Sequence, residues 1–202
     1  MNSINPLWLT PIWEVQTNFD HEFNQTLLNE MYAISIGMST EAEPKISLWD
    51  YETPALSQLK HVILDAVQLH LARDLREVNE LNIGFRCDMA WVNVKEPGES
   101  IELHGHPDAS FAATYYVQTP DSCGDLVVID HTGREIALPP VTGKIVFFPA
   151  YVLHRIEPNC SNDLRISIST DITQVIDPTA PNALVLKSWC NDMLKIGQWH
   201  NS

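Results

Sequence analysis

Three side chains that commonly bind metal ions alternate along residues 102–110 (ELHGHPDAS): His104, His106 and Asp108. In a β-strand, residues that are two positions apart lie on the same face of the sheet. If this segment is extended, the three side chains point to one side and can approach a single ion. His-x-His alone is a weak signal, because two exposed histidines beside a Pro-Asp turn explain the same residues equally well.

A third histidine and an arginine follow in two later strand candidates. His154 lies in YVLHRI, and Arg165 opens the alternating segment RISIST, in which Arg165, Ser167 and Ser169 share one face. An arginine on the inner face of a β-barrel is costly unless it meets an anion, and its planar fork suits a carboxylate. Two or three nitrogen and oxygen ligands with open positions are typical of a non-heme Fe(II) site. The arginine would then anchor an acidic co-substrate.

Two helices are expected ahead of these segments. Apolar residues at helical spacing predict a first helix over residues 21–34 and a longer one over residues 54–75. Thr53 is expected to be the N-cap of the second helix, and Pro54 its first helical residue. The buried side of this helix would be formed by Leu59, Val62, Ile63, Val67, Leu69 and Leu71.

From residue 84 onward, short β-rich segments alternate with turn residues. The strand candidates are GFRCDMAWVNV, SIELHGH, SFAATYYVQ, DLVVID, KIVFFP, YVLHRI and LRISIST, with breaks at EPGE, TPDSCG, HTGRE, LPPVTG and EPNCSND. Seven or eight strands at this spacing predict an antiparallel sandwich or barrel, with the two helices bracing one of its sheets. The expected fold class is α+β and mainly β.

We expect one domain over residues 1–202. A strand and supporting helices would occupy about residues 1–80, the β core about residues 84–172, and a C-terminal extension residues 173–202. Residues 182–199 in that extension are expected to add a helix.

The composition describes a globular protein with a large negative charge. The 202 residues are 45% apolar and 19% charged, with 12 Lys and Arg against 26 Asp and Glu, a formal charge of −14. Such a charge repels phosphate backbones, so nucleic acid is not an expected partner. No apolar run reaches the roughly 20 residues that span a bilayer, so no membrane partner is expected. Four cysteines without a CxxC pair, and no secretion-signal pattern, favour a cytoplasmic location.

Three longer segments, and the order in which they follow one another along the chain, resemble a known family. They resemble the Fe(II)/2-oxoglutarate-dependent oxygenases, and most closely a group of such oxygenases, found in bacteria and phages, that shares an HxHP motif. The segments are AWVNVKEPGESIELHGHPDASFAATYYVQ, LPPVTGKIVFFPAYVLHRIEP and RISISTDI. The opening PLWLTPIWEV is similar to that group's first strand, so the resemblance covers roughly residues 6–15 and 88–172. It implies a double-stranded β-helix, a jelly-roll or cupin-like fold in which helices buttress the larger sheet.

The resemblance also implies roles for individual residues. His154 matches the distal iron ligand, and Arg165 matches the arginine that pairs with the C5 carboxylate of 2-oxoglutarate. Tyr116 lies where a tyrosine often hydrogen-bonds the same carboxylate, while Asn93 and Ser167 are implied to contribute to co-substrate binding. No catalytic side chain beyond the metal ligands is implied.

The first metal-binding motif has two registers. A Pro-Gly turn six residues ahead of the first ligand is common in the family, and Pro97-Gly98 then selects His104, with His106 in the usual carboxylate position. A shift by two residues selects His106 and Asp108 instead, which restores an HxD pair. Both registers keep His106 and His154. The first is slightly favoured, because the HxHP group retains both histidines.

The implied activity is a dioxygenase reaction that uses Fe(II), 2-oxoglutarate and O2. It would hydroxylate a small molecule or a peptide side chain and release succinate and CO2, and a homodimer is left open. One rival is a cupin-type metalloenzyme that does not use 2-oxoglutarate, for which Arg165 would be dispensable. The other is a non-catalytic β-sandwich binding protein with histidines at its rim, which would not take up Fe(II) tightly.

Overall fold

The computed structural model describes residues 11–37, 47–74 and 83–176. Two α-helices, a short 3-10 helix and nine β-strands occur in these ranges. Their bounds are β1 Trp13–Gln16, α1 His21–Gly37, η2 Leu48–Asp50, α2 Pro54–Asp74, β2 Ile83–Lys95, β3 Ile101–His104, β4 Phe111–Gln118, β5 Leu126–Ile129, β6 Glu135–Leu138, β7 Lys144–Pro149, β8 His154–Ile156 and β9 Arg165–Ile176.

The strands form two antiparallel sheets whose order confirms the expected double-stranded β-helix. The larger sheet has the order β1-β7-β4-β9-β2, and the smaller sheet has the order β3-β8-β5-β6. From β2 to β9 the chain passes back and forth between the two sheets, and only β5 and β6 follow each other in the same sheet. The strand that carries Arg165, β9, lies between β4 and β2 in the larger sheet.

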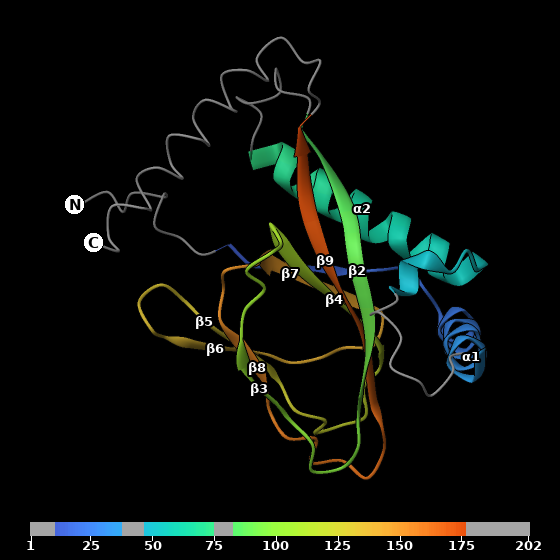
Figure 1. Ribbon diagram of the computed structural model, residues 1–202. Coiled ribbons are helices and arrows are strands. Elements are labelled where there is room, and N and C mark those ends of the chain that lie inside the picture. The colour runs from blue at the N-terminus through green and yellow to red at the C-terminus, as the bar shows by residue number, and fades with distance from the viewer. Residues whose placement is uncertain (1–10, 38–46, 75–82, 177–202) are drawn as a thin grey trace.

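The larger sheet lies between the two helices and the smaller sheet (Figure 1). It separates two apolar layers. On one side it packs against α1 and α2, and on the other side it faces the smaller sheet. Alternate residues of β4 show the division, because Tyr115 belongs to the helix-side core and Tyr116 to the core between the sheets. The site residues therefore lie between the two sheets, away from the helices.

The two helices begin close to where the sequence predicts them. On α2, Leu59, Ile63 and Val67 are fully buried as expected, but Leu69 is 70% exposed, so its assignment to the buried side was wrong. The side chain of Leu71 lies outside the described part of the chain. Leu69 is exposed because it falls between the buried positions of the 3.6-residue period.

The start of α2 is capped by a residue of the other helix. The carboxylate of Glu30 on α1 accepts hydrogen bonds from the backbone N–H groups of Ala55 and Leu56, at 3.0 and 3.1 Å. The hydroxyl of Thr53, the expected N-cap, donates to the same carboxylate at 2.5 Å. Glu30 thus satisfies the free donors of the first turn and joins the two helices.

Two further sequence predictions differ from the structure or fall outside it. The segment that begins at the last residue of HTGRE, Glu135, forms β6, a strand that the pattern did not predict, and β9 continues to Ile176 instead of ending near residue 170. The helix expected over residues 182–199 lies outside the described residues. Within the ranges that the structure covers, no helix is long and apolar enough to cross a membrane.

Candidate active site

Strand pairing brings two of the predicted metal ligands together. His104 at the end of β3 and His154 at the start of β8 are directly paired across the antiparallel ladder. His106 follows in the turn after β3, where its backbone N–H donates to the carbonyl oxygen of Ala150 at 2.9 Å. The two histidines of the HxH motif therefore lie in different local structures. His104 is on β3, and His106 is in a turn that is hydrogen-bonded to the segment between β7 and β8.

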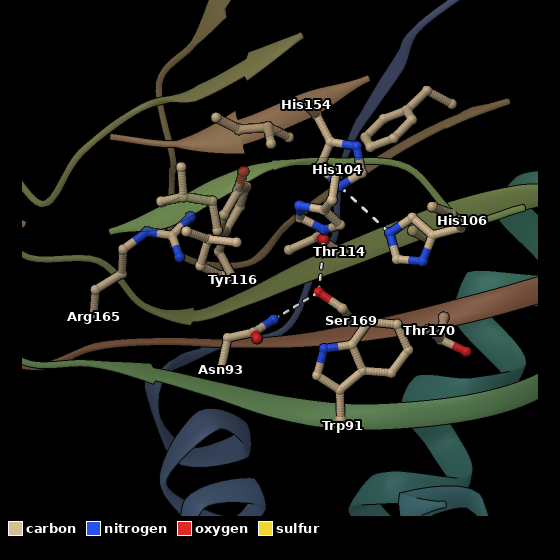
Figure 2. Close-up of a pocket in the computed structure, with 16 residues that line it drawn as sticks. Trp91, Asn93, His104, His106, Thr114, Tyr116, His154, Arg165, Ser169 and Thr170 are labelled. Atoms are coloured by element: carbon tan, nitrogen blue, oxygen red, sulfur yellow. Dashed lines mark hydrogen bonds between the residues drawn. The ribbon is translucent and has the colours of Figure 1, made fainter. Parts of the chain in front are cut away.

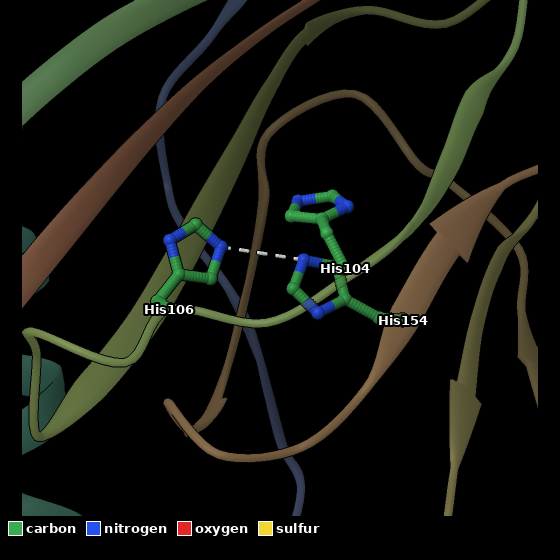
Figure 3. Close-up of side chains that lie close together, drawn as sticks. All are labelled: His104, His106 and His154. Atoms are coloured by element: carbon green, nitrogen blue, oxygen red, sulfur yellow. Dashed lines mark hydrogen bonds between the residues drawn. The ribbon is translucent and has the colours of Figure 1, made fainter.

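The three imidazoles lie close enough together to bind one ion (Figure 3). One ring nitrogen from each of His104, His106 and His154 lies within 4.8 Å of the others. The Nε2 atoms of His106 and His154 are 3.4 Å apart. Two nitrogens that each bind a common ion at about 2.1 Å can be at most about 4.2 Å apart, so this pair fits.

All three rings have an oxygen atom next to Nδ1. Nδ1 of His104 lies 2.8 Å from the carbonyl oxygen of Glu102, and Nδ1 of His154 lies 3.0 Å from that of Val152. Nδ1 of His106 lies 2.8 Å from a carboxylate oxygen of Asp171. These oxygens favour the tautomer with the proton on Nδ1, which leaves the Nε2 lone pair for a metal ion.

Asp108, the alternative to His104, does not lie in this cluster. It is exposed in the turn after His106, and the group of potential ligands within reach of one another consists of His104, His106 and His154. The geometry is therefore compatible with the register that starts at His104.

Burial keeps His154 neutral at ordinary pH. Its side chain is buried, and loss of water around the ring lowers its pKa from 6.5 to about 4. The hydrogen bond to the Val152 carbonyl opposes this effect, and the nearby His104 and His106 add to it. A neutral imidazole is the form that binds a metal ion.

Arg165 is a buried cation whose donors lack sufficient protein partners. The residue is fully buried, and its Nε and Nη2 atoms have no hydrogen-bond partner, while Nη1 reaches the hydroxyl of Ser167 at 3.5 Å. The ring of Tyr116 lies 5.3 Å from the guanidinium carbon, and its hydroxyl is also buried without a partner. Unpaired buried donors of this kind require an anion, because an isolated charge is expensive to bury.

Tyr116 is a hydrogen-bond donor at any ordinary pH. Burial raises the pKa of its hydroxyl to about 12, and the positive charge of Arg165 only partly offsets this effect. A protonated phenol and a guanidinium side by side match the two oxygens of a carboxylate.

The histidines and Arg165 line one cavity of about 160 Å³ between the sheets (Figure 2). On its larger-sheet side, the amide nitrogen of Asn93 donates to the hydroxyl of Ser169 at 2.9 Å, and Ser169 also lies 3.0 Å from the hydroxyl of Thr114. Ser167, predicted from its place on the same face of β9, contacts Arg165 but is not part of the cavity wall. The apolar part of the wall includes Ala112, Leu126, Phe148 and Ile156.

Sequence reasoning missed Asp171 as a partner of the site. It shares the face of β9 on which Arg165, Ser167 and Ser169 lie, so extending the two-residue period by one step would have found it. Thr114, in the FAATYYVQ strand, could have been found in the same way from its spacing to Tyr116.

Comparison with known families agrees with the geometry. Residues 89–138 and 130–171 match a family model described as "Putative 2OG-Fe(II) oxygenase". This match contains His104, His106, His154 and Arg165. No curated protein matches the sequence.

Solved structures with the same fold are distant in sequence. A prolyl-4-hydroxylase of Pseudomonas putida is 18% identical, with a TM-score of 0.58 over 83% of this chain and 90% of its own. The epimerase SnoN of nogalamycin biosynthesis, in complex with Fe3+, α-ketoglutarate and nogalamycin RO, is 13% identical, with a TM-score of 0.60 over 84% and 82%. The non-heme monooxygenase ThoJ, in complex with nickel, is 16% identical, with a TM-score of 0.60 over 85% and 77%.

The order of strands, the match over residues 89–171 and the place of the histidines and the arginine within it agree with one another: the core of this chain matches the 2OG-Fe(II) oxygenase family model and has the fold of solved enzymes of that kind.

Proposed function

We propose that this protein is an Fe(II)- and 2-oxoglutarate-dependent dioxygenase that hydroxylates a small molecule or a peptide side chain. The observation that carries this proposal is the unpaired guanidinium of Arg165, buried in the same cavity as three convergent imidazoles. A metal site alone would fit many enzymes. A metal site that shares a cavity with an unsatisfied cation fits a co-substrate with a chelating end and a distant carboxylate.

In this proposal the protein binds and orients both groups. His104, His106 and His154 hold Fe(II) through Nε2, and Arg165 and Tyr116 take the C5 carboxylate of 2-oxoglutarate. When bound, iron and O2 supply the oxidation, in which 2-oxoglutarate becomes succinate and CO2 and one oxygen atom enters a C–H bond of the substrate. No side chain is needed as a general acid or base.

The hydrogen-bonded side chains next to Arg165 give the cavity a polar wall for the co-substrate. Asn93, Ser169 and Thr114 hold one another in place, so their remaining donor and acceptor positions face a defined direction. On the other side, Phe148 packs its ring edge against His154 at 4.9 Å between centroids and shields that ligand from water. An apolar wall strengthens the charge interaction between Arg165 and a carboxylate, because the local dielectric constant is low.

The first test is an anaerobic titration with Fe(II) and 2-oxoglutarate, monitored by visible absorption. We expect a weak charge-transfer band that requires both additions, followed by succinate when oxygen is admitted. His106→Ala and His154→Ala should abolish the band. His104→Ala should abolish it as well, whereas Asp108→Ala should preserve it.

The rivals predict different results in the same experiment. A cupin-type metalloenzyme would bind Fe(II) but give no band and no succinate with 2-oxoglutarate, and Arg165→Met would leave its turnover intact. A binding protein without catalysis would not retain Fe(II). If Asp108→Ala removed the band and His104→Ala did not, the alternative ligand set would replace the one proposed.

Two proteins of the same fold support the proposed substrate classes. One similar structure is a prolyl-4-hydroxylase and another holds nogalamycin RO, so both a peptide residue and a small molecule fit a protein of this fold. A screen of metabolites and peptides for stimulated succinate formation would separate them.

We also propose a cytoplasmic location, which the free thiols of the described cysteines Cys87, Cys123 and Cys160 support.

A further inference from the structure

Asp171 on β9 lies beside one of the three histidines. Its Oδ1 atom is 2.8 Å from Nδ1 of His106, and the two side chains are 25% and 12% exposed. The contact is short but bent, and Oδ1 is buried without a well-aligned hydrogen bond from any described residue. At this distance the Nδ1–H of His106 is close enough to donate to the carboxylate.

Backbone hydrogen bonds hold the two side chains in place. The turn that carries His106 is tied to β9 by a bond from the Ser110 N–H to the carbonyl oxygen of Ile172, at 2.9 Å. It is tied to the end of β7 by the bond from the His106 N–H to Ala150, at 2.9 Å. Because Ile172 is the neighbour of Asp171, these bonds fix the distance between the carboxylate and the imidazole.

The ring of His106 is also held on its face. Trp91 stacks on it with 5.7 Å between ring centroids and 28° between planes. One edge of the imidazole then faces Asp171, and the other points Nε2 towards His154. The ring is thus constrained in both position and orientation.

Among the three histidines, His106 has the charged partner. Nδ1 of His104 and of His154 meets a neutral backbone carbonyl, whereas Nδ1 of His106 meets a carboxylate. A ligand set of three neutral imidazoles leaves the full charge of Fe(II) uncompensated. A carboxylate behind one imidazole makes that ring a stronger donor and returns one negative charge to the site.

We propose that Asp171 is a positioning residue that keeps the proton of His106 on Nδ1, aims its Nε2 at the metal and supplies the negative charge that a three-histidine ligand set lacks. This inference rests on the proposed function, since it assumes that the histidines bind Fe(II). The strand β9 then has two tasks, because Arg165 at its start anchors the co-substrate and Asp171 further along tunes a metal ligand.

The test compares Fe(II) affinity and the charge-transfer band in the wild type, Asp171→Asn and Asp65→Asn. The asparagine keeps the shape of the side chain and removes its charge. Asp65 is exposed on α2, on the opposite side of the larger sheet, so Asp65→Asn removes the same charge far from the site. Circular dichroism confirms that all three proteins are folded.

We expect Asp171→Asn to bind Fe(II) about 10- to 100-fold more weakly, as is typical for partners of metal-binding histidines. Its iron–2-oxoglutarate band should move to shorter wavelength, because a less electron-rich Fe(II) gives up an electron less readily. Asp65→Asn should change neither property. A merely structural role for Asp171 would not move the band.

Three results would contradict the inference or its basis, and they can be told apart. If the wild type does not bind Fe(II), the proposed function fails. If the wild type binds and Asp171→Asn matches it in affinity and band position, the role of Asp171 is refuted. If Asp171→Asn loses all binding, as we expect for His154→Ala, then Asp171 is itself a ligand and not a positioning residue.

Discussion

Arg165 costs stability in the absence of a co-substrate. Its guanidinium is fully buried, and two of its nitrogens have no hydrogen-bond partner. Burying a charge removes its hydration, and only a partner with matching geometry compensates. The free protein therefore contains an unfavourable interaction, which a carboxylate bound as we propose would relieve.

Replacing Arg165 by methionine should stabilise the co-substrate-free protein and abolish 2-oxoglutarate binding. An apolar side chain of similar length removes the buried charge, and such replacements often stabilise by roughly 1–4 kcal/mol. Thermal unfolding with and without 2-oxoglutarate, in the presence of Fe(II), measures both effects. We expect a higher Tm for Arg165→Met without co-substrate and no further rise when it is added.

Arg155→Met is the matched control. Arg155 pairs with Glu135 on the partly exposed side of β8, at 2.8 and 2.9 Å. Its replacement should change Tm only slightly and leave the shift with 2-oxoglutarate intact. A fall in Tm for Arg165→Met would mean that the guanidinium already has a stabilising partner in the free protein.

At the scale of elements, a period of two explains why the inward residues of β9 and the place of His104 on β3 could be predicted. The alternation of polar residues with isoleucines identifies the inward face of β9. The pairing of β3 with β8 brings His104 and His154 together. The position of His106 was harder to predict, because it lies in a turn where the strand period no longer applies. Its place depends on a long-range backbone hydrogen bond to Ala150, which cannot be inferred from the local sequence.

The hairpin of β5 and β6 shows where local patterns fail. HTGRE was interpreted as a break, and it does contain a turn, in which Gly133 has a φ of +82° and Asp130 accepts bonds from Thr132 and Arg134. The strand that follows has four residues and pairs with β5 alone among the described strands. The strand begins at Glu135, the last residue of HTGRE, so the turn signal covered its start.

Gly124 at the entrance to β5 should tolerate no side chain. Its φ is +85°, and a Cβ atom would lie 2.8 Å from the carbonyl carbon of Glu157 and 2.9 Å from the oxygen of Pro158. These are backbone atoms of the segment after β8, so they cannot move aside easily. We expect Gly124→Ala to lower the free energy of unfolding by roughly 3 kcal/mol.

Gly133→Ala separates the effect of close packing from that of backbone conformation. Gly133 has a nearly equal φ of +82°, but a Cβ atom there would meet nothing within 4 Å. Its replacement should cost only about 1 kcal/mol, from the left-handed conformation alone. Urea unfolding measures both variants, and equal losses would show that contact with the segment after β8 is unimportant.

At the scale of the whole molecule, a buried neutral histidine sits in a strongly acidic protein. The formal charge is −14, so self-repulsion decreases as the carboxylates take up protons on acidification. His154 acts in the opposite direction. Its pKa is about 4 in the folded protein and about 6.5 in an unfolded chain, so only the unfolded chain takes up its proton between these values.

The metal-free protein should therefore lose a specific part of its stability between pH 6.5 and pH 4. Above pH 6.5 the imidazole of His154 is neutral in both the folded and the unfolded protein, so its burial does not lower the free energy of unfolding. As the pH falls towards 4, the free energy of unfolding decreases, because only the unfolded chain takes up the proton. At 1.36 kcal/mol for each pH unit, the total is about 3 kcal/mol. Urea unfolding in the presence of a chelator, from pH 7 to pH 4, gives the curve.

Comparison with His154→Asn isolates this contribution, because the carboxylates titrate in both proteins and cancel in the difference. Asparagine cannot take up a proton, so the wild type should lose about 3 kcal/mol more than the variant over this interval. Parallel curves would show that the imidazole is as easily protonated in the folded protein as in the unfolded chain. The ring would then be hydrated rather than buried, and the smaller sheet would not shield the three histidines from water.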